Sequence, residues 1–199
     1  MTDSQTESQI YQNHLWDRRS STIYRVRVSV LYHLKREQFF DVCDKWTAMA
    51  VAVAATSAVG LLLKEAGHSP ELWAAAITAI LALVPLVVNP AHKARNHAGA
   101  AGEFRRLLAE CTRTGERWSE AQCDQFAGKV VELEATEPAP LCALVIDCQN
   151  QLNIASGKPE ERVPLRFYER WLKQWIDFDA SKIVGRHEKQ VARQHPAHP

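Results

Sequence analysis

Two uncharged, apolar segments dominate the pattern of hydrophobic and polar positions along this chain. The first is Trp46 to Leu63 (WTAMAVAVAATSAVGLLL), and the second is Leu72 to Val88 (LWAAAITAILALVPLVV). A transmembrane helix needs about 20 mostly apolar residues, with roughly 17 to 25 tolerated. Neither segment has the polar face that a helix of a small bundle usually keeps. The pattern therefore predicts two membrane-spanning helices, residues 46–63 and 72–88.

Aromatic and basic residues flank these segments in an arrangement typical of a membrane hairpin. Trp46 begins the first segment and Trp73 lies near the start of the second, where interfacial aromatic residues belong. Lys93 and Arg95 follow the second segment and are candidate membrane-surface anchors together with the two tryptophans. Because positively charged flanks stay in the cytoplasm, we expect both termini to be cytoplasmic.

Small residues recur at four-residue spacing within the two segments, which lets helices approach closely in lipid. They are Ala50, Ala54 and Ala58 in the first segment and Ala74, Thr78 and Ala82 in the second. The hydroxyls of Thr56, Ser57 and Thr78 either line a weakly polar pore or bond to carbonyl groups of their own helix. Pro85 predicts a kink, which is either a hinge or a fixed bend.

Helical patterns cover most of the remaining chain. A long helix is predicted from Thr22 into the first apolar segment, and another ends near Gly115. Ser119 and Gln122 have the spacing of a capping box at the start of a further helix. The next helix is closed by Gly157 as a C-terminal cap. Its apolar stripe is Leu141, Leu144, Val145, Cys148 and Leu152.

The two ends of the chain are predicted to differ from this central part. Residues 1–21 are expected to be flexible, and residues 179–199 form a basic tail that is expected to be disordered. Residues 158–178 are predicted to form an amphipathic helix. Its apolar stripe is Leu165, Tyr168, Leu172, Trp175 and Ile176. The fold class is thus an all-α membrane protein, in which a two-helix transmembrane hairpin follows a long pre-helix and joins a cytosolic helical bundle.

The composition excludes only a few classes of function. The chain has 199 residues and a net charge of +1, so no global field favours nucleic acid or an anionic surface. The five cysteines form no CxxC pair, which fits a reducing compartment better than a secreted disulfide framework. The polar N-terminal stretch does not have the pattern of a signal peptide.

The sequence contains no recognisable catalytic constellation, so an enzyme, a metal site and a cofactor are not predicted. His92 and His97 do not have the i, i+4 spacing of a helical metal pair. Arg105 and Arg106 are candidates for binding the phosphates of a nucleotide, because guanidinium groups suit phosphate oxygens. The alternative is that both arginines belong to a solvated or salt-bridged face.

One stretch of the chain carries a family resemblance. An acidic helix end followed by prolines (Glu134, Glu137, Pro138, Pro140) precedes the Cys148 to Gln151 stretch, and both come after the hairpin and its basic flanks. This order resembles the SLATT family of two-transmembrane effectors, which occur beside nucleotide-signalling enzymes in bacterial antiphage systems. The resemblance covers residues 22–157, and many relatives carry an acidic residue where Gln151 stands.

The resemblance implies an oligomeric effector, a tetramer or larger, that forms a pore in the bacterial inner membrane and causes abortive infection. The trigger would be a nucleotide second messenger or oligonucleotide from an associated nucleotidyltransferase, acting directly or through a separate partner protein. The alternative is a non-conducting, membrane-anchored scaffold or sensor that recruits a cytosolic partner through the face from Tyr168 to Trp175. A soluble helical bundle and a holin-like toxin are further alternatives.

Overall fold

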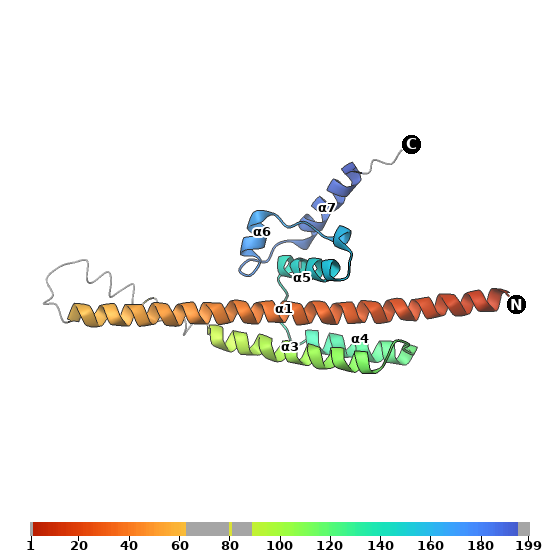
Figure 1. Ribbon diagram of the computed structural model, residues 1–199, viewed down its shortest axis with the longest axis horizontal. Coiled ribbons are helices and arrows are strands. Elements are labelled where there is room, and N and C mark those ends of the chain that lie inside the picture. The colour runs from red at the N-terminus through yellow and green to blue at the C-terminus, as the bar shows by residue number, and fades with distance from the viewer. Residues whose placement is uncertain (1, 63–79, 81–88, 195–199) are drawn as a thin grey trace. The chain divides into compact units, whose positions relative to one another are not determined.

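The structure is a computed structural model that describes residues 2–62, 80 and 89–194, and all regular elements in these ranges are helical (Figure 1). The all-α prediction is therefore confirmed for this part of the chain. The helices are α1 (Thr2–Leu62), α3 (Pro90–Arg113), α4 (Glu120–Glu134), α5 (Cys142–Ala155), the 3₁₀ helix η1 (Pro159–Glu161), α6 (Phe167–Leu172) and α7 (Ala180–Gln194). They form two compact units, a first unit of Met1–His33 with Ala100–Pro199 and a second unit of Leu34–Gly99.

The predicted transmembrane hairpin is not supported. Within the described residues, no helix is both long enough and apolar enough to cross a bilayer. The apolar stretch from Trp46 belongs to α1, in which it directly follows Asp41, Asp44 and Lys45. Of the segment 72–88, only Ile80 is described. The predicted placement in the bacterial inner membrane, with both termini cytoplasmic, rested on this hairpin and is corrected with it.

The predicted ends of the chain also differ from the structure. Residues 2–21, expected to be flexible, are the beginning of α1. The single amphipathic helix expected over residues 158–178 is replaced by η1 and the short helix α6. Much of the tail expected to be disordered is α7. Helix formation therefore extends into segments whose polar composition alone did not favour it.

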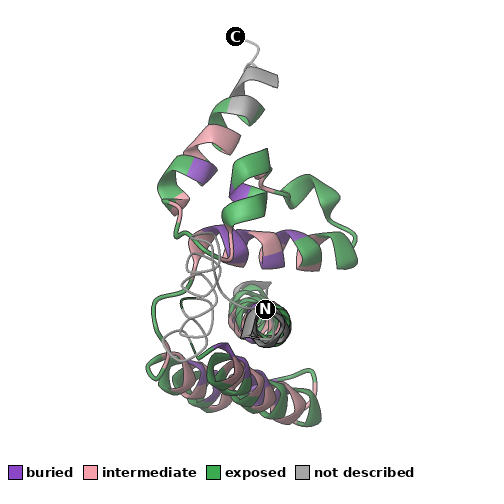
Figure 2. Ribbon diagram, turned by 90° about the vertical axis from the view of Figure 1, so that its left-hand side faces the viewer, coloured by how far each residue is buried: buried purple, intermediate pink, exposed green. Residues whose placement is uncertain are grey.

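Helix α1 provides two apolar faces to the first unit, because its large side chains follow two helical stripes. Ile23, Val26 and Val30 pack into a first cluster with α3 and α4. Val28 and Tyr32 pack into a second cluster with α5. Positions three, four or seven apart lie on one side of a helix, which explains why the two sets diverge. Within the first unit, α1 consequently lies between the α3–α4 pair and α5 (Figures 1 and 2).

The first cluster is the most aromatic part of the buried core. Phe104 of α3, Trp118 of the α3–α4 connection and Phe126 of α4 are 0, 4 and 5% exposed. The rings of Trp118 and Phe126 lie 4.6 Å apart between centroids. Each large ring removes a large apolar area from water, so this cluster supplies much of the unit's hydrophobic stabilisation.

Helix ends in the first unit follow the local signals in the sequence. Ser119 caps α4 and forms the predicted capping box with Gln122. Gly157 has a φ of 75°, and its N–H donates to Ile154 O while the next N–H, of Lys158, donates to Asn153 O. These two bonds form a Schellman motif, in which glycine adopts the left-handed conformation without a Cβ clash. Both predicted caps are confirmed.

The second unit has its own aromatic contact. Phe40 is 7% exposed, and its ring stacks on His97 with a centroid distance of 5.7 Å and an interplanar angle of 8°. The guanidinium of Arg36 lies 4.5 Å and the ammonium of Lys93 lies 5.5 Å from the centroid of the same ring. These cation–π contacts explain how Phe40 is covered in this unit.

Candidate functional site

The candidate site lies in the C-terminal module, a name used here for helices α5, η1, α6 and α7 of the first unit. Ala143 and Ile146 of α5 and Ile183 of α7 form its buried centre, against which Val163, Leu165 and Phe178 pack. Ile183 is 1% exposed. Because α5 also packs on α1 through Leu144 and Cys148, the module has a firm base. Functional side chains on α6 and α7 are thus held by a packed support.

A buried amide fixes the chain that leads into α6. The side-chain N–H of Asn150 donates to Val163 O, and Val163 N–H donates to Asn150 Oδ1, both at 2.8 Å. Asn150 is 8% exposed. A buried amide that exchanges two hydrogen bonds with the backbone fixes both the position and the direction of that segment. Asn150 therefore fixes the backbone at Val163, four residues before α6 begins at Phe167.

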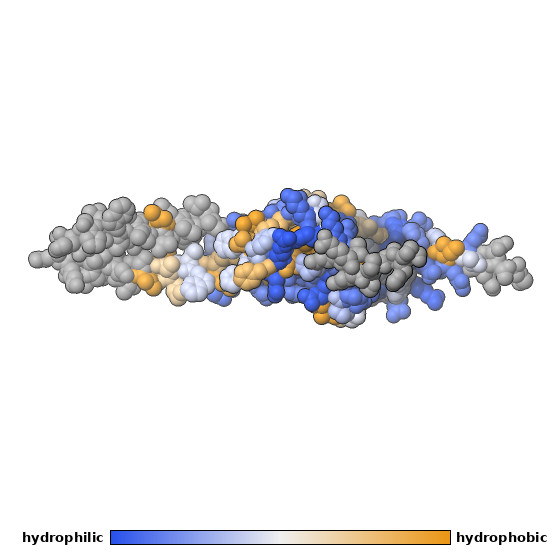
Figure 3. Space-filling model, turned by 90° about the horizontal axis from the view of Figure 1, so that it is seen from above, coloured by the Kyte–Doolittle hydropathy of each residue, from blue (hydrophilic) through white to orange (hydrophobic). Residues whose placement is uncertain are grey.

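Helix α6 and the residues after it expose an unusual amount of apolar surface. Phe167, Trp171 and Trp175 are 76, 73 and 67% exposed. Leu172 and Ile176 beside them are 38 and 46% exposed. We call these five residues the aromatic face. Most of the α6 ribbon is coloured as exposed in Figure 2, and Figure 3 looks onto the side of the first unit where α6 and α7 lie, with apolar and hydrophilic side chains next to one another.

The predicted apolar stripe of residues 165–176 is only partly correct as a consequence. Leu165 packs against the third cluster of α5 and α7, but Tyr168, Leu172, Trp175 and Ile176 are exposed. A small cavity of about 450 Å³ lies at this face, lined by Phe167, Arg170, Trp171 and Lys173. Most of the apolar residues of this segment thus face outward, whereas the predicted stripe would be expected to face the core.

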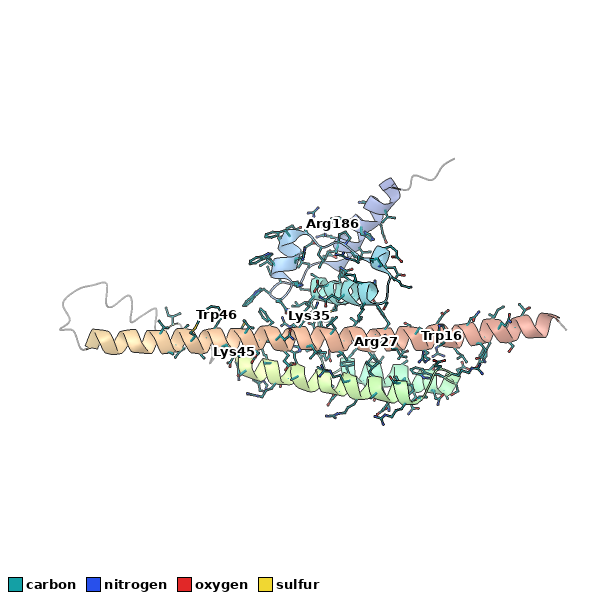
Figure 4. All side chains as sticks on the ribbon, in the orientation of Figure 1. Trp16, Arg27, Lys35, Lys45, Trp46 and Arg186 are labelled. Carbon is teal, nitrogen blue, oxygen red and sulfur yellow. The ribbon has the colours of Figure 1, made fainter. Side chains whose placement is uncertain are left out.

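On its other side, α6 faces α7 across a second and larger cavity, of about 770 Å³. Glu169 of α6 is 4% exposed and accepts hydrogen bonds from Arg166 N–H at 2.7 Å and from the guanidinium of Arg186 at 2.5 Å. Arg186 is labelled in Figure 4, where α7 runs close to α6. This charge-assisted pair connects the two helices at the cavity.

Four of the cysteine thiols are shifted away from the reactive thiolate form. Burial raises the pKa of Cys111, Cys123, Cys142 and Cys43 above the ordinary value. A thiol whose pKa is raised stays protonated at neutral pH, whereas the thiolate is the reactive form. Among the described residues, no group of three histidine, cysteine or carboxylate side chains is placed to hold a metal ion.

Many of the predicted site residues lie outside the described residues, or their side chains do. Ala50 lies on α1 and is half-buried, whereas the side chains of Ala54, Thr56, Ser57 and Ala58 are not described. The remaining members of the predicted hairpin that lie outside the described residues are Trp73, Ala74, Thr78, Ala82 and Pro85. Their roles as packing, pore-lining, anchoring or hinge residues stay predictions of the sequence.

The other predicted residues are exposed cations or aromatic side chains. Trp46 is 63% exposed on α1 (Figure 4), and Lys93 lies over the Phe40 ring. Arg95 is exposed and lines a small cavity beside Asp41 and Asp44. Arg105 and Arg106 are exposed on α3, and the structure does not bring them together with the C-terminal module cavities.

Sequence reasoning missed the basic side of α7. Lys182, Gly185, Arg186 and Lys189 all line the larger cavity. Their spacing of i, i+3, i+4 and i+7 is the signal that would have found them, because such positions share one face of a helix. The polar, basic composition of residues 179–199 instead predicts a disordered tail, which hides this spacing.

Comparisons with protein-family models, with curated proteins and with solved structures gave no match. The geometry itself defines the class of site. The described residues combine an exposed aromatic face with a neighbouring cavity rich in cations, which are features of binding.

Proposed function

We propose that this chain is a helical scaffold whose C-terminal module recruits a protein partner through the aromatic face of α6. The observation that carries the proposal is the exposure of Phe167, Trp171 and Trp175 by two thirds or more in one short stretch. Contiguous exposed apolar surface typically marks an interaction site. Tryptophan is also among the residues that contribute most to binding free energy at interfaces.

The aromatic face is held in place by contacts with the rest of the module, which is typical of a binding surface. The face begins four residues after Val163, which Asn150 holds, and Glu169 anchors α6 through Arg186. Lys173 is likewise fixed, because its ammonium pairs with Asp147 of α5 at 2.7 Å. A face held in advance loses less conformational entropy when a partner binds.

The charge around the face selects the partner's chemistry. Arg170 is exposed and lines the small cavity together with Phe167, Trp171 and Lys173. Aromatic rings next to cations suit a peptide that offers apolar anchors and carboxylates, since opposite charges at the rim of an interface speed encounter and fix register. The proposed occupant is therefore an acidic, amphipathic peptide segment of a partner protein.

This proposal retains the recruiting scaffold that the sequence offered as an alternative, without its membrane anchor. The pore-forming effector depended on the membrane hairpin and is not carried forward. Control by a nucleotide signal and assembly into a homo-oligomer stay predictions of the resemblance.

Selection of displayed peptides on the full-length chain tests the partner's chemistry directly. Selected peptides should combine aromatic or leucine anchors with a negative net charge. Trp171→Ala should weaken the best of them by about 30-fold or more, which corresponds to about 2 kcal/mol or more for a central tryptophan. Fluorescence anisotropy with a labelled peptide measures this loss.

Trp16→Ala is the matched control, because Trp16 is also an exposed tryptophan, at 53%, but lies on α1. It should leave the peptide affinity unchanged. Basic peptides, or acidic ones that bind the Trp171→Ala variant equally well, would refute the proposal. So would self-association in sedimentation that Trp171→Ala abolishes, because the face would then be occupied by a second copy.

A further inference from the structure

The cavity between α6 and α7 has a composition that the aromatic face does not explain. Its cationic lining residues are Arg166 from the start of α6 and Lys182, Arg186 and Lys189 from α7. Its carboxylates are Glu169, Asp177 and Asp179. Some of these charged groups already have hydrogen-bond or ion-pair partners within the described part of the protein, and others do not.

The three carboxylates are engaged in structural contacts. Glu169 accepts from Arg186 and from the backbone of Arg166. Asp177 accepts from the backbone N–H of Cys142 at 3.0 Å. Asp179 accepts from both the N–H and the hydroxyl of Ser181, and these bonds hold its pKa below the ordinary value. The carboxylates thus fasten the ends of helices, and the four cationic side chains of the lining outnumber them by one.

The cations are less completely matched. Arg186 pairs with Glu169, and the ammonium of Lys182 lies 3.7 Å from Asp179. Among the residues that the structure describes, Arg166 and Lys189 form no ion pair, although the guanidinium of Arg166 donates to the hydroxyl of Tyr168 at 3.1 Å. Lys182, Arg186 and Lys189 share one helix face, where like charges repel each other. An anion in the cavity would relieve that repulsion.

The remaining walls are aromatic. Tyr168 and Phe178 line the same cavity, with ring centroids 6.0 Å apart and a tilt of 52°. Aromatic surfaces favour a planar, apolar group stacked or edge-on against them. Gly185 adds open space on α7, because a Cβ built there meets no atom within 4 Å. A volume of about 770 Å³ is in the range of small-molecule sites.

We propose that this cavity binds a small aromatic molecule that carries a phosphate group. The phosphate lies against Arg166, Lys189 and the outward N–H groups of Arg186, since guanidinium and ammonium groups bind phosphate oxygens well. The aromatic body lies against Tyr168 and Phe178. This cavity shares no lining residue with the small cavity at the aromatic face.

Titration calorimetry of the full chain with phenyl phosphate, inorganic phosphate and phenol tests the site. Phenyl phosphate should bind at least about tenfold more tightly than inorganic phosphate, because its ring adds buried apolar area to the same anion. Phenol should show no measurable binding, because it lacks the phosphate. Lys189→Gln should weaken phenyl phosphate by about tenfold.

Gly185→Trp should abolish binding, because the indole occupies the cavity, whereas Gly185→Ala should retain it. Circular dichroism and the melting temperature show whether each variant folds. If Gly185→Trp does not fold, the affinity of Lys189→Gln for phenyl phosphate tests the site. Arg162→Gln is the matched control, because it removes an exposed cation of the C-terminal module that does not line this cavity. Equal weakening by Arg162→Gln and Lys189→Gln, or no heat at millimolar phenyl phosphate, would overturn the proposal.

Discussion

Two sets of aromatic side chains in the first unit differ completely in their environment. Phe104, Trp118 and Phe126 in the first cluster are 5% exposed or less. On α6 and directly after it, Phe167, Trp171 and Trp175 are at least 67% exposed. The composition of the two sets is nearly the same, so hydrophobicity alone does not separate a core from a surface.

The difference arises from what each helix has for a neighbour. In the first cluster, α1, α3 and α4 all contribute apolar side chains, so each ring is covered from several directions. Helix α6 is only Phe167–Leu172, and it directs the carboxylate of Glu169 toward Arg186 of α7. Its buried side is therefore used for an ion pair, and its rings remain available for another molecule.

The largest expected effect comes from truncating one ring of each set. Phe104→Ala should lower the free energy of unfolding by about 3–5 kcal/mol, because it leaves a cavity in a closely packed cluster. Phe167→Ala should change it by less than about 0.5 kcal/mol, as for most surface positions. Urea unfolding measures both. Equal losses would mean that Phe167 is buried in the native protein and would break the comparison.

A smaller effect is expected at the amide that places α6. Asn150→Ala should cost about 1–3 kcal/mol, because it leaves the N–H and C=O of Val163 without partners. Gln151→Ala, next in the chain and exposed, is the matched control and should be nearly neutral. The same unfolding experiment applies. If the aromatic face binds as proposed, Asn150→Ala should also weaken peptide binding, because α6 loses its fixed starting point.

The smallest effect concerns pH at the first cluster's edge. The ammonium of Lys129 bonds to Glu110 and holds the pKa of this carboxyl below its ordinary value of 4.5. Because the folded pKa is the lower one, the contribution to stability is present above pH 4.5 and is lost as the pH falls through the folded value. Glu110→Gln should therefore reduce the difference in stability between pH 7 and pH 3. A pH profile of Glu110→Gln that parallels that of the unmodified chain would contradict this assignment.

The sequence predicts the helices that support the candidate site better than it predicts the exposed and charged residues of the site. The residues from Leu141 to Leu152 share one face as predicted, because spacing along one helix is a local property, and the structure adds that this face packs against α1. Ser119 and Gly157 act as predicted for the same reason. The exposure of Trp171 and the helix around Arg186 depend instead on which neighbours are present, and periodicity contains no such information. The membrane assignment failed for a related reason, since an uncharged run has the same composition in a core helix and in a bilayer.

The buried thiols give the molecule its own set of reporters. Cys111 and Cys123 lie in the first cluster and Cys148 lies in the second, each 0–1% exposed. An alkylating reagent reaches such a sulfur only when the surrounding helices separate, so the rate of labelling at each cysteine reports a local opening free energy. Peptide mass spectrometry reads the three sites in one sample. A ligand that rigidifies the C-terminal module would protect Cys148 selectively, which would locate its effect without an engineered probe.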